Sequence, residues 1–117
     1  MSNFTLRCFS CERAHDPRVL QGVCTACGQP LRVDYDLASI RLKRSDLRDR
    51  VASLWRYREV LPAPEAEPVS LCEGYTPLLP VAANVWVKDE SRNPTGSFKA
   101  RGMSAAVSMA KLLGAKK

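Results

Sequence analysis

Two C-x-x-C pairs constrain the first part of this chain more than any other feature. They are Cys8-Phe9-Ser10-Cys11 and Cys24-Thr25-Ala26-Cys27, and twelve residues separate them. A tight turn with two residues between cysteines aims both sulfurs at one point, so two such turns can arrange four thiolates around Zn²⁺ at about 2.3 Å. The spacing therefore predicts a zinc ion bound by Cys8, Cys11, Cys24 and Cys27.

Other interpretations of the cysteines remain open at this point. Iron in a rubredoxin-like site is the main competitor, because four cysteines discriminate weakly between the two metals. Four reduced core thiols would leave the doubled spacing unexplained, and a redox C-x-x-C would need a βαβ context. His15 lies between the pairs and could replace one cysteine, although an exposed loop histidine is the simpler interpretation. Cys72 stands alone and is interpreted as a small buried hydrophobe.

Length and charge limit the class of protein. With 117 residues, the chain can form one small core, or a small module and the beginning of a larger domain. No apolar run reaches the roughly 18 residues of a membrane span, and no signal peptide is evident, so we expect a cytoplasmic location and no membrane partner. The net charge is +6, but basic and acidic residues are interleaved, which does not favour nucleic acid. An anionic, phosphate-bearing ligand would suit the charge.

The first two parts of the chain have distinct patterns. Residues 1–40 are expected to form a small module around the four cysteines, with short strands at 4–7 and 31–36 beside the cysteine turns. Residues 41–68 are expected to form a helix capped by Ser45 and ended by Pro62, and then a proline-rich connector. The buried face of that helix would carry the side chains of Leu47, Val51, Leu54 and Trp55.

The third part, residues 69–117, combines a turn-rich stretch with strand and helix signals. Residues 85–88 are expected to form a strand, which a loop joins to a helix over 98–113 that Gly114 closes. Strand, loop and helix would make half of a βαβ unit. The apolar face of the helix would consist of Met103, Ala106, Val107, Ala110 and Leu113.

The loop before this helix carries the second chemical signal. Asn93-Pro94-Thr95-Gly96 is a turn signature, and Ser97 is placed to cap the helix. Lys99 then falls in the first helical turn, beside the positive end of the helix dipole, where its amine could serve as a nucleophile. On pattern alone, an ordinary surface lysine remains the alternative.

Residues 93–102 resemble the cofactor-lysine motif of fold-type II pyridoxal-phosphate enzymes, and within that group the chain is most similar to threonine synthases. Residues 55–62 resemble the family's tryptophan-arginine-tyrosine segment, residues 73–78 resemble its EGxTPL loop, and many members carry the cysteine pairs. The resemblance implies an α/β fold, in which a small zinc-ribbon-like β head precedes the start of a domain like that of tryptophan synthase β.

The same resemblance implies a cofactor, a substrate and a set of site residues. Lys99 would hold pyridoxal 5'-phosphate as a Schiff base and move protons, with Thr95, Ser97 and Phe98 beside the cofactor or substrate. The substrate would be O-phospho-L-homoserine, converted with water into L-threonine and phosphate.

The chain also departs from the family pattern. Cys72 stands where many relatives have glycine, and Ala100 occupies a position that is often Asp. A threonine dehydratase or another fold-type II lyase is therefore the alternative enzyme. A non-catalytic zinc-ribbon binding module is the alternative from another class.

The family also needs a glycine-rich loop to cradle the cofactor phosphate. After Lys99 the chain has only Gly102 and Gly114, and neither lies in a cluster. We therefore expect the N-terminal third of such an enzyme, inactive alone: a fragment, a truncated reading frame or one piece of a split protein. A C-terminal partner chain or a homo-oligomer would complete it.

Overall fold

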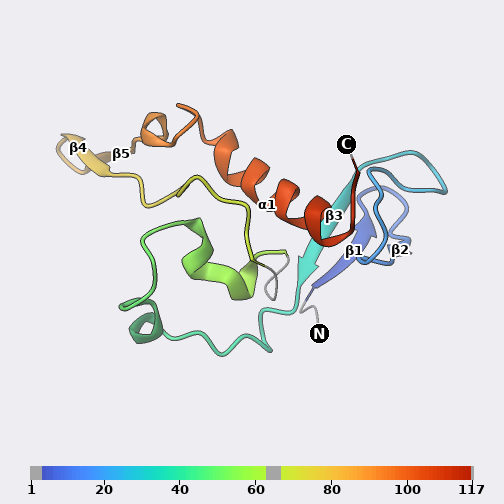
Figure 1. The fold of residues 1–117 in the computed structure, drawn as a ribbon. Coiled ribbons are helices and arrows are strands. Elements are labelled where there is room, and N and C mark those ends of the chain that lie inside the picture. The colour runs from blue at the N-terminus through green and yellow to red at the C-terminus, as the bar shows by residue number, and fades with distance from the viewer. Residues whose placement is uncertain (1–3, 63–66, 117) are drawn as a thin grey trace.

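The computed structural model describes residues 4–62 and 67–116. At one end of the molecule is a three-stranded antiparallel sheet, visible in Figure 1, in which β1 (Phe4–Cys8) lies between β2 (Ala14–His15) and β3 (Leu31–Tyr35). The two longer strands confirm the alternating apolar and polar patterns that predicted them. A two-residue strand such as β2 is too short to leave a periodic signal.

This small sheet has little apolar core of its own. Phe4 is buried and its ring lies 5.7 Å from that of Tyr35, while Cys8 and Cys24 are the other buried apolar side chains nearby. A small sheet with so little buried apolar surface is marginal without further constraints. The cysteine cluster therefore has to supply much of the stability of this part.

The prediction of a single helix after residue 45 is wrong. Two short 3-10 helices, η1 (Arg44–Leu47) and η2 (Leu54–Val60), take its place, and Lys43 rather than Ser45 is the N-cap of the first. The helix is interrupted because the backbone N–H of Leu54 donates to the carbonyl of Glu73, at 2.6 Å, instead of to a preceding turn. Of the predicted buried face only Trp55 is buried. The expected end before Pro62 is confirmed, since Leu61 is extended.

Trp55 connects η2 to the last helix. Its indole Nε1 donates to the hydroxyl of Ser104 at 2.9 Å, and that hydroxyl donates to the carbonyl of Val69 at 2.7 Å. The N–H of Val69 donates in turn to the hydroxyl of Ser108 at 2.9 Å. One buried indole and two buried serines thus hold three segments together that are distant in sequence.

The helix α1 (Lys99–Leu112) matches the predicted boundaries within one residue at each end. Gly114 has φ +72°, and its N–H and that of Ala115 donate to the carbonyls of Lys111 and Ala110, which is a Schellman ending. The prediction that the apolar face of this helix is its buried face is wrong, because Met103 and Val107 are exposed. The buried positions of the helix are Ala100, Ser104 and Ser108. The helix packs by its small and hydroxyl side chains.

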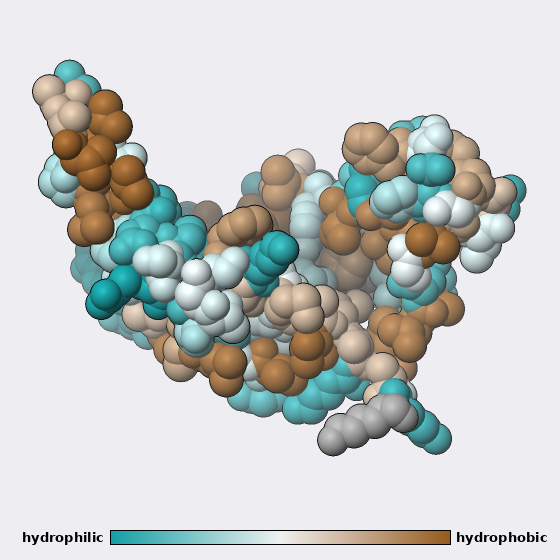
Figure 2. All heavy atoms as spheres, turned by 90° about the horizontal axis from the view of Figure 1, so that it is seen from above, coloured by the Kyte–Doolittle hydropathy of each residue, from teal (hydrophilic) through white to brown (hydrophobic). Residues whose placement is uncertain are grey.

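A projecting hairpin precedes α1. The strand expected at 85–88 is confirmed as β5 (Val85–Lys88), and it pairs in antiparallel fashion with β4 (Leu78–Ala82), which the turn-rich sequence with Pro80 concealed. All residues of both strands are exposed, and Figure 2 shows the hairpin as an apolar arm. Within residues 4–62 and 67–116, β5 has no parallel neighbour. No helix in these ranges is long and apolar enough to cross a bilayer.

Gly74 provides a test of how the segments interlock. It has φ +93°, and a Cβ added there would lie 2.8 Å from the backbone nitrogen of Leu54. We expect Gly74→Ala to lower the free energy of unfolding by about 2–4 kcal/mol, because it combines backbone strain with a clash against a fixed backbone. Urea denaturation followed by tryptophan fluorescence would measure the change.

The matched control is Gly102→Ala in α1. A Cβ there meets no atom within 4 Å, so the substitution should raise the free energy of unfolding by about 1 kcal/mol through helix propensity. Equal effects of the two substitutions would contradict the proposed close contact between Gly74 and Leu54.

Candidate functional site

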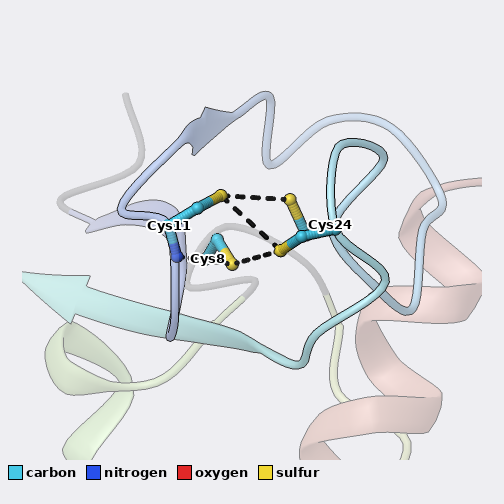
Figure 3. A group of neighbouring side chains, drawn as sticks. Cys8, Cys11 and Cys24 are labelled. Atoms are coloured by element: carbon cyan, nitrogen blue, oxygen red, sulfur yellow. Dashed lines mark hydrogen bonds between the residues drawn. The ribbon is translucent and has the colours of Figure 1, made fainter.

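The four cysteines of the two C-x-x-C pairs come together as their spacing predicts. Their sulfurs all lie within 4.8 Å of one another, with Sγ–Sγ distances of 3.4 Å for Cys8–Cys27, 3.7 Å for Cys11–Cys24 and 3.6 Å for Cys11–Cys27 (Figure 3). Four sulfurs at about 2.3 Å from one ion in a tetrahedron would be about 3.8 Å apart. The donor set therefore fits a tetrahedral metal ion.

The two cysteine turns share one backbone geometry. The N–H of Cys8 donates to the carbonyl five residues later, at 2.9 Å, and the N–H of Cys24 does the same at 2.8 Å. The residue after each pair is left-handed, Gly28 at φ +70° and Glu12 at φ +58°. In the sequence, the glycine after the second pair indicated a left-handed residue there. The glutamate after the first pair gave no such indication, so the sequence did not reveal that the two turns are alike. The carboxylate of Glu12 is fixed by a two-point ion pair with Arg32, at 2.7 and 2.8 Å.

The buried member of each pair is stabilised as a thiolate. Backbone hydrogen bonds lower the pKa of the Cys8 thiol, and the bond from the N–H of Cys11 has the largest effect. Burial acts to raise the pKa of Cys24, but hydrogen bonds, among them one from the backbone N–H of Ala26, lower it to about 6. A metal ion binds thiolates rather than thiols, so these backbone donors favour metal binding.

Two further expectations about single residues need correction. Cys72 is exposed rather than buried, and it has φ +67°, a region that favours glycine because a Cβ is strained there. This backbone angle gives a physical reason for the glycine expected at that position from the family pattern. His15 is half-buried on β2 rather than exposed in a loop.

The loop at residues 93–98, which leads into Lys99 and is called the lysine loop below, has the local structure expected from its turn signature. Lys99 is the first residue of α1 and is exposed, and Gly96 is left-handed at φ +67°. The hydroxyl of Ser97 accepts the backbone N–H of Lys99 at 3.3 Å, although the N-cap of the helix is Phe98. Thr95 and Phe98 are exposed beside them. The four residues singled out in the sequence thus lie at one end of the helix.

A partly buried polar network fixes this loop, and the sequence did not reveal that its members are joined. The carboxylate of Glu90 accepts hydrogen bonds from Arg101 at 2.7 and 2.8 Å, from Thr76 at 2.7 Å and from Asn93 at 2.8 Å. The side-chain oxygen of Asn93 accepts the N–H of Gly74 at 3.0 Å. Thr76 and Gly74 enter the network from a segment 14 and 19 residues away from their partners, and sequence spacing does not reveal contacts between such distant segments.

The cysteine cluster and Lys99 lie far apart. In Figure 1 the three-stranded sheet is near the C-terminal end of α1, whereas Lys99 begins the helix at its other end. A helix of 14 residues is about 21 Å long. The geometry therefore gives the cysteine cluster a structural place and no direct contact with chemistry at Lys99.

Comparison with known proteins gives the class to which the second half of the chain is related. Residues 69–117 match the family described as pyridoxal-phosphate dependent enzyme. This segment contains the β4–β5 hairpin, the lysine loop and α1.

Individual relatives narrow the class further. The chain is 41% identical to a threonine synthase of Methanocaldococcus jannaschii, over 92% of this chain and 29% of the relative. It is 36% identical to a threonine synthase of Methanosarcina acetivorans, over 95% of this chain and 29% of the relative. The resemblance to the N-terminal portion of threonine synthases is thereby confirmed, and the chain spans less than a third of the length of these relatives. No solved structure matches the chain.

The Glu90 network predicts how stability depends on pH. The ion pair with Arg101, together with the hydrogen bonds, lowers the pKa of Glu90 to about 2. A lowered pKa means that the contribution is complete above the ordinary value of 4.5 and is lost as the pH falls towards 2. Glu90→Gln should therefore reduce stability at pH 7 and flatten its decline between pH 4.5 and 2, as measured by urea denaturation at each pH.

Glu67→Gln is the matched control, because Glu67 is exposed. It should leave the pH profile of the parent chain unchanged. A Glu90→Gln profile that keeps the full slope of the parent would show that Glu90 does not carry the acid sensitivity.

Proposed function

We propose that this chain is the N-terminal part of a threonine synthase, which converts O-phospho-L-homoserine and water into L-threonine and phosphate. The observation that carries the proposal is the similarity of more than nine-tenths of the chain to two threonine synthases, combined with an accessible amine at Lys99 in the segment of the pyridoxal-phosphate family. Its setting would be the reducing cytoplasm, in keeping with five free cysteines.

The residues at the start of α1 fit one end of pyridoxal phosphate. Lys99 offers a primary amine for the aldehyde, Thr95 and Ser97 offer hydroxyls, and Phe98 offers an exposed aromatic face. When bound, the cofactor would supply an electron sink for bond changes at the substrate carbons. The phosphate-binding loop of the cofactor would come from polypeptide outside these 117 residues.

In this proposal the chain itself contributes positioning and proton transfer. Lys99 accepts protons from the substrate carbons and returns them, which requires that its backbone be held still. The Glu90 network provides this rigidity, because Asn93 ties the lysine loop to Gly74 and Arg101 ties α1 to Glu90. The ion pair between Arg101 and Glu90 is thus a positioning element for Lys99.

The exposed apolar surfaces support completion by further polypeptide. Both strands of the β4–β5 hairpin expose Leu, Val and Trp side chains, and Met103 and Val107 expose an apolar stripe on α1. Surfaces of this kind mark contacts with other protein. We propose that they pack against the remaining part of the enzyme, whether in the same chain, in a C-terminal partner chain or in a homo-oligomer.

Reconstitution tests the enzymatic proposal. Residues 1–117 would be joined to the part of the M. jannaschii threonine synthase that the similarity does not cover. We expect the chimera to form L-threonine from O-phospho-L-homoserine, and borohydride to fix the cofactor on Lys99. Lys99→Ala should abolish turnover, whereas Lys111→Ala should not.

The same chimera separates the alternatives. Formation of a keto acid from threonine, without synthesis of threonine, would favour a dehydratase. The unextended chain should bind pyridoxal phosphate weakly, with no preference for Lys99 over Lys111 or Lys116, and should not form threonine. Turnover by the unextended chain, or selective labelling of another lysine in the chimera, would overturn the proposal.

For the cysteine cluster we propose one structural zinc ion, held by a module of residues 1–40 that precedes the connector at 41–68 and the enzyme segment at 69–117. Iron is the competing metal, because four thiolates accept either ion. The sulfur separations and the backbone donors to Cys8 and Cys24 support a closed site with four protein ligands.

Metal analysis tests this part. The protein purified under reducing conditions should contain about one zinc per chain, and Cys8→Ser should abolish metal binding and loosen the three-stranded sheet while leaving α1 in place. Cys72→Ser is the matched control, since Cys72 is exposed and outside the cluster. A chain that contains neither zinc nor iron would contradict the proposal. A chain that contains iron and no zinc would show that iron is the metal of this site.

A further inference from the structure

Three arginine side chains surround one hollow beside the short helices η1 and η2, which is called the arginine pocket below. Its volume is about 500 Å³, which is in the range of small-molecule sites. Its described walls come from the segment at 44–57, whereas the residues proposed to face the cofactor lie at 95–99. The lining residues are Arg44, Ser45, Leu47, Arg48, Arg56 and Tyr57.

The charge of these arginines is not balanced within the pocket. No Asp or Glu is among the lining residues that the structure describes. Within residues 4–62 and 67–116, no carboxylate forms an ion pair with Arg44, Arg48 or Arg56. Asp46 lies between two of them in sequence, but its carboxylate accepts the hydroxyl of Ser45 at 3.1 Å. The pocket therefore gathers three positive charges without a counter-charge.

Arg56 is held in a fixed position at the wall of the pocket. Its Nη2 donates to the carbonyl of Leu47, and its guanidinium lies 5.0 Å from the centre of the Tyr75 ring and 5.8 Å from that of Tyr57. Its backbone carbonyl accepts a hydrogen bond from Arg50 at 2.6 Å. Its Nε atom, in contrast, is buried and has no partner among the described residues. A buried donor without an acceptor is costly, so this guanidinium calls for a further partner.

We infer that the arginine pocket binds a small ligand that carries a phosphate group. Guanidinium groups present planar pairs of donors that match phosphate oxygens, and a doubly charged phosphate compensates more of the three positive charges than a carboxylate can. The exposed ring of Tyr57 lines the same pocket and offers a surface for the organic part of the ligand. A single hollow of this size fits a small ligand better than a nucleic-acid strand, because basic and acidic residues are interleaved along the rest of the chain.

Titration of the full chain with inorganic phosphate, at an ionic strength held constant with chloride, tests the inference. The Nε–H signals of Arg44, Arg48 and Arg56 should shift together in ¹H–¹⁵N spectra and reach saturation. Shifts that rise without saturation, or saturating shifts confined to other residues, would overturn the inference. Binding of a single-stranded RNA oligonucleotide to these arginines, without binding of phosphate, would also overturn it and would favour a nucleic-acid site.

Substitutions provide a second readout. Arg48→Gln should weaken phosphate binding about tenfold, because it removes a charge-assisted hydrogen bond to the ligand. The Arg48 side chain is exposed, so an unchanged circular-dichroism spectrum is expected. Arg41→Gln is the matched control, since it removes the same charge from an exposed residue of the same segment that does not line the pocket. It should change the affinity by less than about twofold. Equal losses of affinity in the two variants would show non-specific attraction and overturn the inference.

Discussion

A shortage of buried apolar surface is the constraint on which this structure depends. Among the described residues, the buried apolar side chains are Phe4, Cys8, Cys24, Trp55 and Ala100. So small a set cannot by itself offset the entropy of ordering more than a hundred residues. Directional interactions therefore define the fold: the four-sulfur cluster in the first part, and the hydrogen bonds of Trp55, Glu73 and Glu90 in the second.

These directional interactions differ in how far their effects extend. The sulfur cluster joins two turns that share one backbone hydrogen-bond pattern and lies beside the three-stranded sheet. By contrast, the carboxylate of Glu73 accepts the hydroxyl of Ser70 and the N–H of Leu71, while its carbonyl accepts the N–H of Leu54. Glu73 and its neighbour Gly74 thus connect η2 to the lysine loop. A change at either residue is expected to reach Lys99 without touching it.

Local signals predicted much of this architecture. The cysteine spacing, the two longer strands of the sheet, and the helix ended by Gly114 each depend on residues close in sequence, where turn and capping chemistry decides the structure. The failures involve distant partners. The N–H of Leu54 is taken by Glu73, nineteen residues away, and α1 packs through Ser104 and Ser108 against Trp55 and Val69. Periodicity ranks faces by hydrophobicity and cannot foresee a serine face that packs through hydrogen bonds.

The exposed apolar face of α1 and the exposed Lys99 have one physical explanation in the proposed enzyme. A lysine that transfers protons to and from carbon works in a site from which water is excluded, whereas Lys99 faces solvent in this structure. The surfaces that exclude water must be apolar and close to the lysine, and the exposed Met103, one turn further along α1, meets that description. Covering the apolar face of α1 would therefore also remove Lys99 from water. Burial of this face and completion of the proposed active site would then be the same event.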